Sequence, residues 1–288
     1  IALREGLFPE GVEYDPVNER FLVSSTSEGT VFSVADDGTL TPLVQDERIP
    51  ASLGLEVDET GNRLLVAATD QQSTGFLGIY DLGTGENLAW VDFSPLTPND
   101  PEHFVNDVAV DSQGNAYVTD SYAGVIYRVD AQGNARIFLE DESFSTQFTL
   151  NGIAYQEQGN YLIAVRVPDL IKIPLDNPTA FTTVAFDTPL NGADGIAFVD
   201  ERSLVVVTNN PANVYRLESS DEFASAQATG RFEPGTVFPT TVAVRAGEAY
   251  VLYAQLNAQD RTISEFPIQR VDFSNMMLEA TPEATPGQ

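Results

Sequence analysis

Four oxygen-bearing side chains stand at equivalent points of the sequence, each directly before a short strand-like segment. They are Glu10, Asn106, Asn151 and Asp194. Carboxylate and amide oxygens bind hard cations, and a set with two carboxylates suits Ca²⁺ first and Mg²⁺ or Mn²⁺ next, with Zn²⁺ as a further possibility. Asn and Asp also favour turns for reasons unrelated to metals. Because the four recur in register, we expect a metal site rather than four separate turns.

The register comes from a module that the chain repeats. Each copy begins with a turn, continues through a short alternating apolar strand and an Asp/Gly/Asn-rich turn, and ends in a second, more continuously apolar strand. Two further strand-like runs usually follow, such as GTVFSVA and LTPLVQ. The six copies are FPEGVEYDPVNERFLVSST, ASLGLEVDETGNRLLVAAT, HFVNDVAVDSQGNAYVTDS, FTLNGIAYQEQGNYLIAVR, NGADGIAFVDERSLVVVTN and FPTTVAVRAGEAYVLYA.

The spacing of the module predicts the fold. Copies recur every 43 to 53 residues, and four short strands at that period are typical of a β-propeller. We therefore predict an all-β, six-bladed β-propeller with four antiparallel strands per blade over residues 1–278, the alternative being an irregular β-sandwich. The opening IALRE is expected to close the ring beside TISEF and IQRVDF, covering exposed strand edges. Residues 279–288 are Pro/Thr/Ala-rich and are expected to form a disordered tail.

A propeller places equivalent residues in a ring. The innermost strand of every blade lines the central channel, so the residues that open these strands lie at one depth around it. Leu53 and Thr240 would complete this ring without charge beside the four candidate ligands.

Composition narrows the classes of partner. The formal net charge is −29, with a single lysine and no cysteine. Nucleic acid is a poor partner for such a surface because its phosphates require a basic one, and without cysteine there is no disulfide, thiolate metal site or cysteine nucleophile. The acidity suits self-repelling solubility or an extracellular, salt-adapted setting. No apolar stretch reaches the roughly 18 residues of a membrane helix, and we expect a secreted or periplasmic monomer whose upstream segment was removed.

At the ring residues the sequence resembles the family of gluconolactonase and regucalcin (senescence marker protein) and, more distantly, diisopropylfluorophosphatase and the paraoxonases. The resemblance covers nearly the whole folded chain. It rests on Glu10 in FPEGVEYD, Asn106 in VNDVAVD, Asn151 in LNGIAY and Asp194 in ADGIAF. The resemblance implies one divalent cation held by these four residues, which polarises a lactone carbonyl or phosphoryl oxygen. It also implies Asp194 as general base or nucleophile, a role that a carboxylate beside a Lewis acid can fill.

The chain departs from those families at two points. Phe104 stands where the gluconolactonase-type Arg is expected, two residues before Asn106, which weakens the case for a sugar lactone. His103 is the only histidine, so a paraoxonase-type histidine dyad cannot form.

The loops after the second strands are expected to surround the metal site, because these strands run antiparallel to the first. Phe8, Phe104 and Phe238 each precede a ring residue by two positions and either pack between blades or face the substrate. His103 is interpreted as a surface residue or, alternatively, a proton shuttle. Candidate substrate contacts are Asp70, His103, Phe104, Asp120, Tyr122, Arg166, Asn209 and Tyr253.

Three functions fit these features. The first is a metal-dependent hydrolase acting on a small-molecule lactone or related ester. The second is phosphotriester hydrolysis in the same site. The third is a non-catalytic metal-binding propeller that serves as a scaffold for a ligand or protein, since the fold alone does not fix function.

Overall fold

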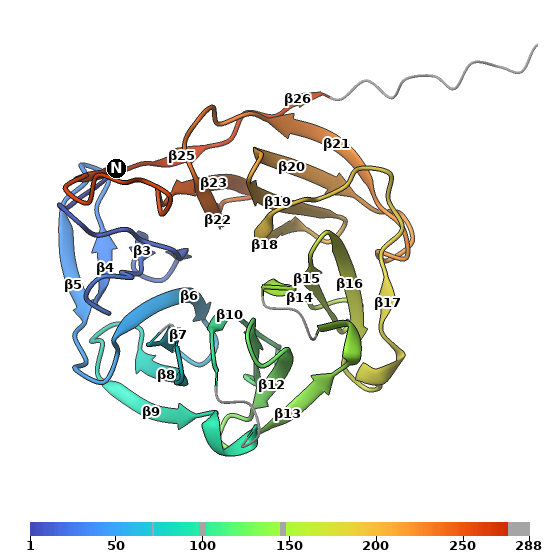
Figure 1. The fold of residues 1–288 in the computed structure, drawn as a ribbon, viewed down its shortest axis with the longest axis horizontal. Coiled ribbons are helices and arrows are strands. Elements are labelled where there is room, and N and C mark those ends of the chain that lie inside the picture. The colour runs from blue at the N-terminus through green and yellow to red at the C-terminus, as the bar shows by residue number, and fades with distance from the viewer. Residues whose placement is uncertain (71, 98–101, 145–147, 276–288) are drawn as a thin grey trace, which may run out of the picture.

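The computed structural model arranges the chain as a ring of β-sheets around a central channel (Figure 1). It describes residues 1–70, 72–97, 102–144 and 148–275. The predicted six-bladed propeller is confirmed. Within the described ranges the helical elements are short 3₁₀ turns, and none is long and apolar enough to cross a membrane. They are η1 (Ser94–Leu96), η2 (Glu142–Phe144) and η3 (Pro178–Ala180).

The first three blades each contain four antiparallel strands, numbered outward from the channel. Blade 1 consists of β2 (Val12–Asp15), β3 (Arg20–Val23), β4 (Val31–Val34) and β5 (Leu40–Val44). Blade 2 consists of β6 (Ala51–Asp58), β7 (Arg63–Thr69), β8 (Gly75–Asp81) and β9 (Asn87–Asp92). Blade 3 consists of β10 (Val105–Val110), β11 (Ala116–Asp120), β12 (Val125–Val129) and β13 (Ala135–Glu140).

The second half of the ring is less regular. Blade 4 consists of β14 (Leu150–Gln156), β15 (Tyr161–Arg166), β16 (Asp169–Pro174) and the short β17 (Thr182–Thr183). Blade 5 consists of β18 (Ala193–Asp200), β19 (Ser203–Asn209), β20 (Ala212–Glu218) and β21 (Gln227–Phe232), with β26 (Ser274–Asn275) added at its outer edge. Blade 6 consists of β22 (Pro239–Arg245), β23 (Glu248–Tyr253) and β25 (Ile268–Arg270).

The chain ends help to close the ring. The N-terminal strand β1 (Ala2–Leu3) pairs antiparallel with β24 (Glu265–Phe266), so the predicted pairing of IALRE with TISEF is confirmed. IQRVDF behaves differently from the prediction, because β25 pairs with β23 instead. The segment beyond it then returns to blade 5, where β26 covers β21. The predicted tail, residues 279–288, lies outside the described residues.

The hydrophobic core is divided among the blade interfaces instead of forming one centre. Six clusters of buried side chains each join two neighbouring blades. In β19, Leu204 and Val206 pack toward blade 4 while Val205 and Val207 pack toward blade 6. Second strands are therefore apolar on both faces, which explains their continuous apolar runs in the sequence.

Candidate functional site

The four predicted ligands line one cavity inside the ring. This cavity has a volume of about 210 Å³, and Glu10, Asn106, Asn151 and Asp194 all contribute to its wall. Leu53 and Thr240 are fully buried beside it. The hydroxyl of Thr240 donates to the carbonyl oxygen of Glu10 at 2.7 Å, which ties blade 6 to blade 1.

β-Bulges present the ring residues. The register of the first two strands shifts between Val105 and Val108 in blade 3, and the same irregularity spans the ring residue in blades 2, 4, 5 and 6. A bulge lets two residues oppose one on the partner strand and re-aims a side chain. In blades 2 to 6 the ring residue thus lies within a bulge of the inner strand, whereas in blade 1 Glu10 precedes a regular β2.

Glycine follows most of the ring residues because the neighbouring inner strand leaves no room for a Cβ atom. A Cβ at Gly11 would collide with the carbonyl of Leu53, and one at Gly152 would collide with the carbonyl of Asp194. Inner strands of adjacent blades approach one another this closely where the ring narrows. Blade 3 carries Asp107 at the equivalent position, and a Cβ on its neighbour Gly54 would strike the Asp107 carboxylate. A glycine in blade 2 therefore makes room for an acidic side chain in blade 3.

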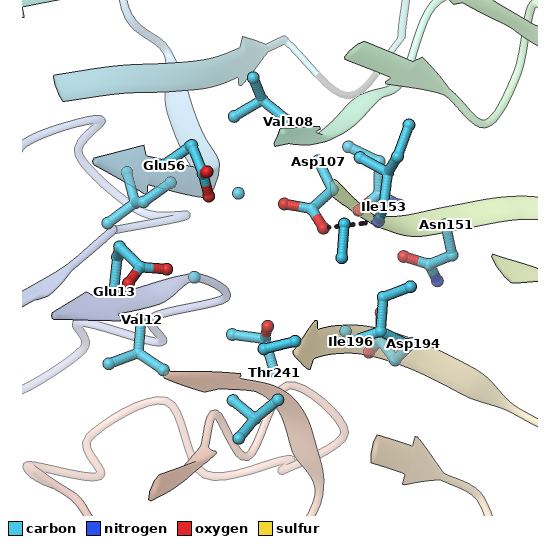
Figure 2. A pocket seen from close by; sticks show the side chains of 18 of the residues that line it. Val12, Glu13, Glu56, Asp107, Val108, Asn151, Ile153, Asp194, Ile196 and Thr241 are labelled. Carbon is cyan, nitrogen blue, oxygen red and sulfur yellow. Dashed lines mark hydrogen bonds between the residues drawn. The ribbon is translucent and has the colours of Figure 1, made fainter. Parts of the chain in front are cut away.

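Three further carboxylates line the same cavity and were missed by sequence reasoning; because they follow the ring residues along the inner strands, we call them the deep acids. Glu13, Glu56 and Asp107 line its wall and point into it from three consecutive blades (Figure 2). Asn151 and Asp194 lie on the side opposite Glu13 and Glu56 (Figure 2). A signal was present, because the position three residues after the ring is Ala in four copies of the module but Glu13 and Glu56 in the other two.

Enclosure and mutual repulsion raise the pKa values of these acids. Burial, with repulsion from Asp194 and Asp107, raises the pKa of Glu10 well above its usual range. Burial raises the pKa of Glu13 to about 8 and those of Asp107 and Asp194 to about 7. The pKa of Glu56 rises for the same reason, and the charges of Glu13 and Asp107 add to the rise. These side chains keep some surface open to the channel, but blades surround them on all sides, so desolvation dominates.

Two ring residues are held by side chains from second strands or the loops after them. The Asn106 amide nitrogen donates to Ser121 Oγ at 2.9 Å, and Ser121 Oγ donates to the carbonyl of Leu150 at 2.6 Å. Asn209 Nδ2 donates to Asp194 Oδ2 at 3.1 Å. Since the Asn106 nitrogen is occupied, its carbonyl oxygen is the atom left to face the channel, as a cation ligand requires.

Both the negative charge of the cavity wall and its oxygen donors suit a bound cation. Within the described part of the chain it includes five carboxylates and no Lys, Arg or His. No cluster of three or more acidic, His or Cys side chains close enough to hold a metal ion occurs among the described residues. The ring offers two carboxylates and two amide oxygens instead, and hard cations accept such mixed oxygen sets.

His103 and Asp120 are placed differently from the prediction. Both are buried, with His103 only 1% exposed, so the interpretation of His103 as a surface residue was wrong. His103 Nδ1 lies 2.7 Å from Asp120 Oδ2, and Asp120 Oδ1 accepts the backbone N–H groups of Phe104, Tyr122 and Ala123. In this conformation the pair joins the loop before β10 to the loop after β11.

The other predicted substrate contacts do not belong to the cavity wall described above. Tyr253 is buried between blades 5 and 6, and its hydroxyl donates to Gln269 Oε1 at 2.7 Å. Arg166 turns outward, donating to Thr183 Oγ1 of the outermost strand of blade 4 at 2.9 Å. Asp70 accepts backbone N–H groups of its own loop, including that of Thr74. Asn209 reaches the site indirectly, through Asp194.

The aromatic residues before the ring divide into two groups. Phe8 is buried against Phe266, with their ring centroids 5.3 Å apart, as expected for packing between blades. Phe238 is half-buried in a shallow pocket shared with Asn209. Phe104 and Tyr122 are also half-buried and contact each other, with their ring centroids 5.2 Å apart.

Comparison with known proteins supports the fold. Neither family models nor the sequences of curated proteins match this chain. The Malassezia sympodialis allergen Mala s 1 superposes with a TM-score of 0.78 at 18% identity, over 93% of this chain and 94% of that chain. A luciferin-regenerating enzyme gives 0.65 at 12% identity over 95% of each chain. Virginiamycin B lyase from Staphylococcus aureus gives 0.63 at 15% identity, over 93% of this chain and 87% of that one. Identities this low establish the shared propeller fold and nothing finer.

Proposed function

We propose that this propeller is a divalent-metal-dependent hydrolase of a lactone or related ester. The observation that carries the proposal is the cavity wall. It combines a ring of four oxygen donors, two of them carboxylates, with three further carboxylates and no cationic side chain in the described part of the chain. Such uncompensated charge inside a protein is costly unless protons or a cation neutralise it. Ca²⁺ suits the donor set best, followed by Mg²⁺ or Mn²⁺.

Glu10, Asn106, Asn151 and Asp194 would hold the cation. When bound, it supplies Lewis acidity toward a carbonyl or phosphoryl oxygen. Asp194 then accepts a proton from the attacking water or attacks the carbonyl itself. Asn209 holds Asp194 Oδ2 through its amide, so the other carboxylate oxygen, Oδ1, is the candidate for contact with the reacting atoms. Asn209 is thereby a positioning residue rather than the substrate contact that the sequence predicted.

Solved propellers of similar fold are consistent with an enzymatic function but do not identify the reaction. They include a luciferin-regenerating enzyme, a lyase and a sugar dehydrogenase. They also include a nidogen–laminin complex, in which a propeller of this fold occurs together with another protein. The alternative is therefore a metal-binding scaffold that uses the same ring without turnover.

A substrate panel separates the two functions. The protein is assayed on lactones, aryl esters and phosphotriesters, each with added Ca²⁺ and with a chelator. We expect turnover of at least one lactone or ester that the chelator abolishes and Ca²⁺ restores. Calcium binding by calorimetry without turnover on any compound would instead support the scaffold, and absence of both would refute the metal site.

A further inference from the structure

Three aromatic side chains form a cluster on the loops that precede β10 and β14 and follow β11, close in the chain to Asn106 and Asn151. This aromatic trio consists of Phe104, Tyr122 and Phe148, whose ring centroids are 5.1 to 5.3 Å apart in every pairing. Phe104 and Tyr122 are half-buried, while Phe148 is 47% exposed. Tilted and edge-to-face contacts at these distances are favourable, so the rings support one another as a surface.

The trio is connected directly to the ring residues through Ser121. The backbone nitrogen of Ser121 donates to the carbonyl of Phe104 at 2.9 Å, and its own carbonyl accepts the N–H of Phe148 at 3.0 Å. Tyr122 is the next residue in the chain. The same Ser121 accepts the Asn106 amide through Oγ and donates to the carbonyl of Leu150, the residue before Asn151. Ser121 therefore connects the backbone of Phe104 and Phe148 to the two amide ligands of the proposed metal site.

The aromatic trio is present although Phe148 has a strained backbone and an exposed ring. Phe148 has a φ of +59°, in the left-handed region that bulky residues avoid. It remains 47% exposed, although burial of aromatic area is favourable. The buried Asp120 carboxylate holds the other two loops by accepting the N–H groups of Phe104 and Tyr122 at 2.9 and 3.1 Å. A strained and exposed aromatic residue packed against two rings whose loops are held in place is a feature of a binding surface.

We propose that the aromatic trio is the subsite for an apolar substituent of the substrate, so that the preferred substrates are lactones or esters with an alkyl or aryl group. This inference rests on the proposed function. A substituent lying on the three rings would direct the ester group toward the loops that carry Asn106 and Asn151, because the buried Ser121 joins the backbone of both regions. The aromatic trio offers three aromatic rings and one phenol hydroxyl, a surface that binds a hydrocarbon group better than a charged one.

A matched pair of lactones tests the subsite. γ-Butyrolactone and γ-decalactone share the same ring and carbonyl, and the second adds an apolar hexyl chain. For Phe148→Asn and Phe104→Ala we expect KM for γ-decalactone to rise by about tenfold, since apolar contacts in a pocket discriminate at that level. KM for γ-butyrolactone should stay within about twofold. Asn tolerates the left-handed backbone, so Phe148→Asn is expected to fold, which its melting temperature checks.

The control removes an exposed apolar side chain elsewhere. Leu88 lies on β9, the outermost strand of blade 2, and is 56% exposed. Leu88→Asn should leave both lactones unaffected. The subsite would be overturned if Leu88→Asn raised KM for γ-decalactone as much as Phe148→Asn does, or if Phe148→Asn raised KM equally for both lactones. Glucono-δ-lactone is assayed as a third substrate. If Phe148→Asn raised KM for this sugar lactone alone, the rings would stack on sugars and the apolar class would be overturned.

A binding measurement keeps this inference separate from the hydrolase proposal. The neutral fluorescent probe N-phenyl-1-naphthylamine is titrated into wild type and Phe148→Asn with chelator present, where no turnover occurs. We expect the variant to bind the probe at least fivefold more weakly than wild type, at about the level that loss of one aromatic contact produces. Probe binding that depends on Phe148 in a protein without turnover supports the subsite and refutes the hydrolase. If the wild type turns over an ester but Phe148→Asn binds the probe as well as wild type, the hydrolase is supported and the subsite is refuted.

Discussion

The ring of candidate ligands and the deeper carboxylates occupy one cavity but are supported in different ways. Asn106 and Asp194 in the ring are held by Ser121 and Asn209, side chains from a second-strand loop and a second strand. Among the deep acids, Glu13 accepts the N–H of its neighbour Tyr14, and Asp107 accepts that of Ile153. Two of the four candidate ligands are therefore oriented by other side chains, whereas Glu13 and Asp107 accept hydrogen bonds from backbone groups.

This difference assigns different roles to similar chemical groups. Oriented oxygens suit a ligand whose geometry matters, whereas acids with raised pKa values suit a store of protons that keeps the channel neutral. Substitutions in the ring should change metal binding and activity. Substitutions among the deep acids should change stability and its dependence on pH.

The largest effect is expected at Asp194. Asp194→Asn retains an oxygen donor but removes the charge and the proton acceptor, so activity should fall by about 10²-fold or more even at saturating Ca²⁺. Glu10→Gln also removes one carboxylate from the ring, yet it should recover more fully when metal is added. Rates are measured on the best ester from the panel, with metal occupancy determined directly. Equal rescue of both variants would leave Asp194 as a ligand only.

Removal of the cation should destabilise the protein strongly. A ligand at about 100 times its Kd stabilises the native state by roughly 2.7 kcal/mol, which corresponds to about 5–10 °C in melting temperature for a chain of this size. Thermal melts with EDTA and with Ca²⁺ measure this shift. Glu56→Gln should retain it and Glu10→Gln should lose most of it. A shift equally reduced in both variants would erase the distinction between ring and deep acids.

Ser121→Ala tests the support of the ring. Its loss leaves the buried carbonyl of Leu150 and the Asn106 amide without their donor and acceptor, which should cost about 1–3 kcal/mol in unfolding free energy. Calcium affinity should fall as well, because Asn106 is no longer oriented. Ser33→Ala is the control, since its hydroxyl bonds to the Thr41 carbonyl on the exposed side of blade 1. Urea unfolding and calorimetry measure the two effects, and unchanged calcium affinity would show that Ser121 has only a structural role.

The smallest effect is expected from the deep acids, in the dependence of stability on pH. A carboxyl whose pKa is raised in the native state stabilises the fold below its unfolded value near 4.3 and loses that contribution as pH rises through the native value. For Glu13 that native value is about 8. The metal-free protein should therefore melt at progressively lower temperature from pH 5 to pH 8.

Glu56→Gln removes one of these charges and should flatten the decline. At pH 8 we expect a gain of about 1 kcal/mol, or about 2–4 °C, and little change at pH 5. Glu86→Gln is a suitable control because Glu86 lies in the exposed turn between β8 and β9, away from the cavity. A melting temperature that rises with pH in the metal-free wild type would contradict the raised pKa values.

The number of blades, the apolar second strands and the four residues that line one cavity were all predictable from the amino-acid sequence. Repetition carries this information, because six copies of one module must occupy equivalent places around a closed ring. The sequence also showed the glycines after the ring residues, but it did not explain why glycine is needed there. They are needed because neighbouring inner strands approach too closely for a Cβ, and that distance exists only after the blades have packed.

Only the tertiary structure decided which other side chains share the cavity and which predicted contacts lie outside it. Glu13, Glu56 and Asp107 come from three different blades, so no local pattern joins them. His103 became a buried partner of Asp120 instead of a surface residue because the loop before blade 3 folds back on the end of β11. Phe148 joined Phe104 and Tyr122 through hydrogen bonds to Ser121, a residue of another blade. These contacts between residues of different blades depend on bulges and on the paths of the loops. Both follow from packing between blades and not from the hydrophobic period of any one strand.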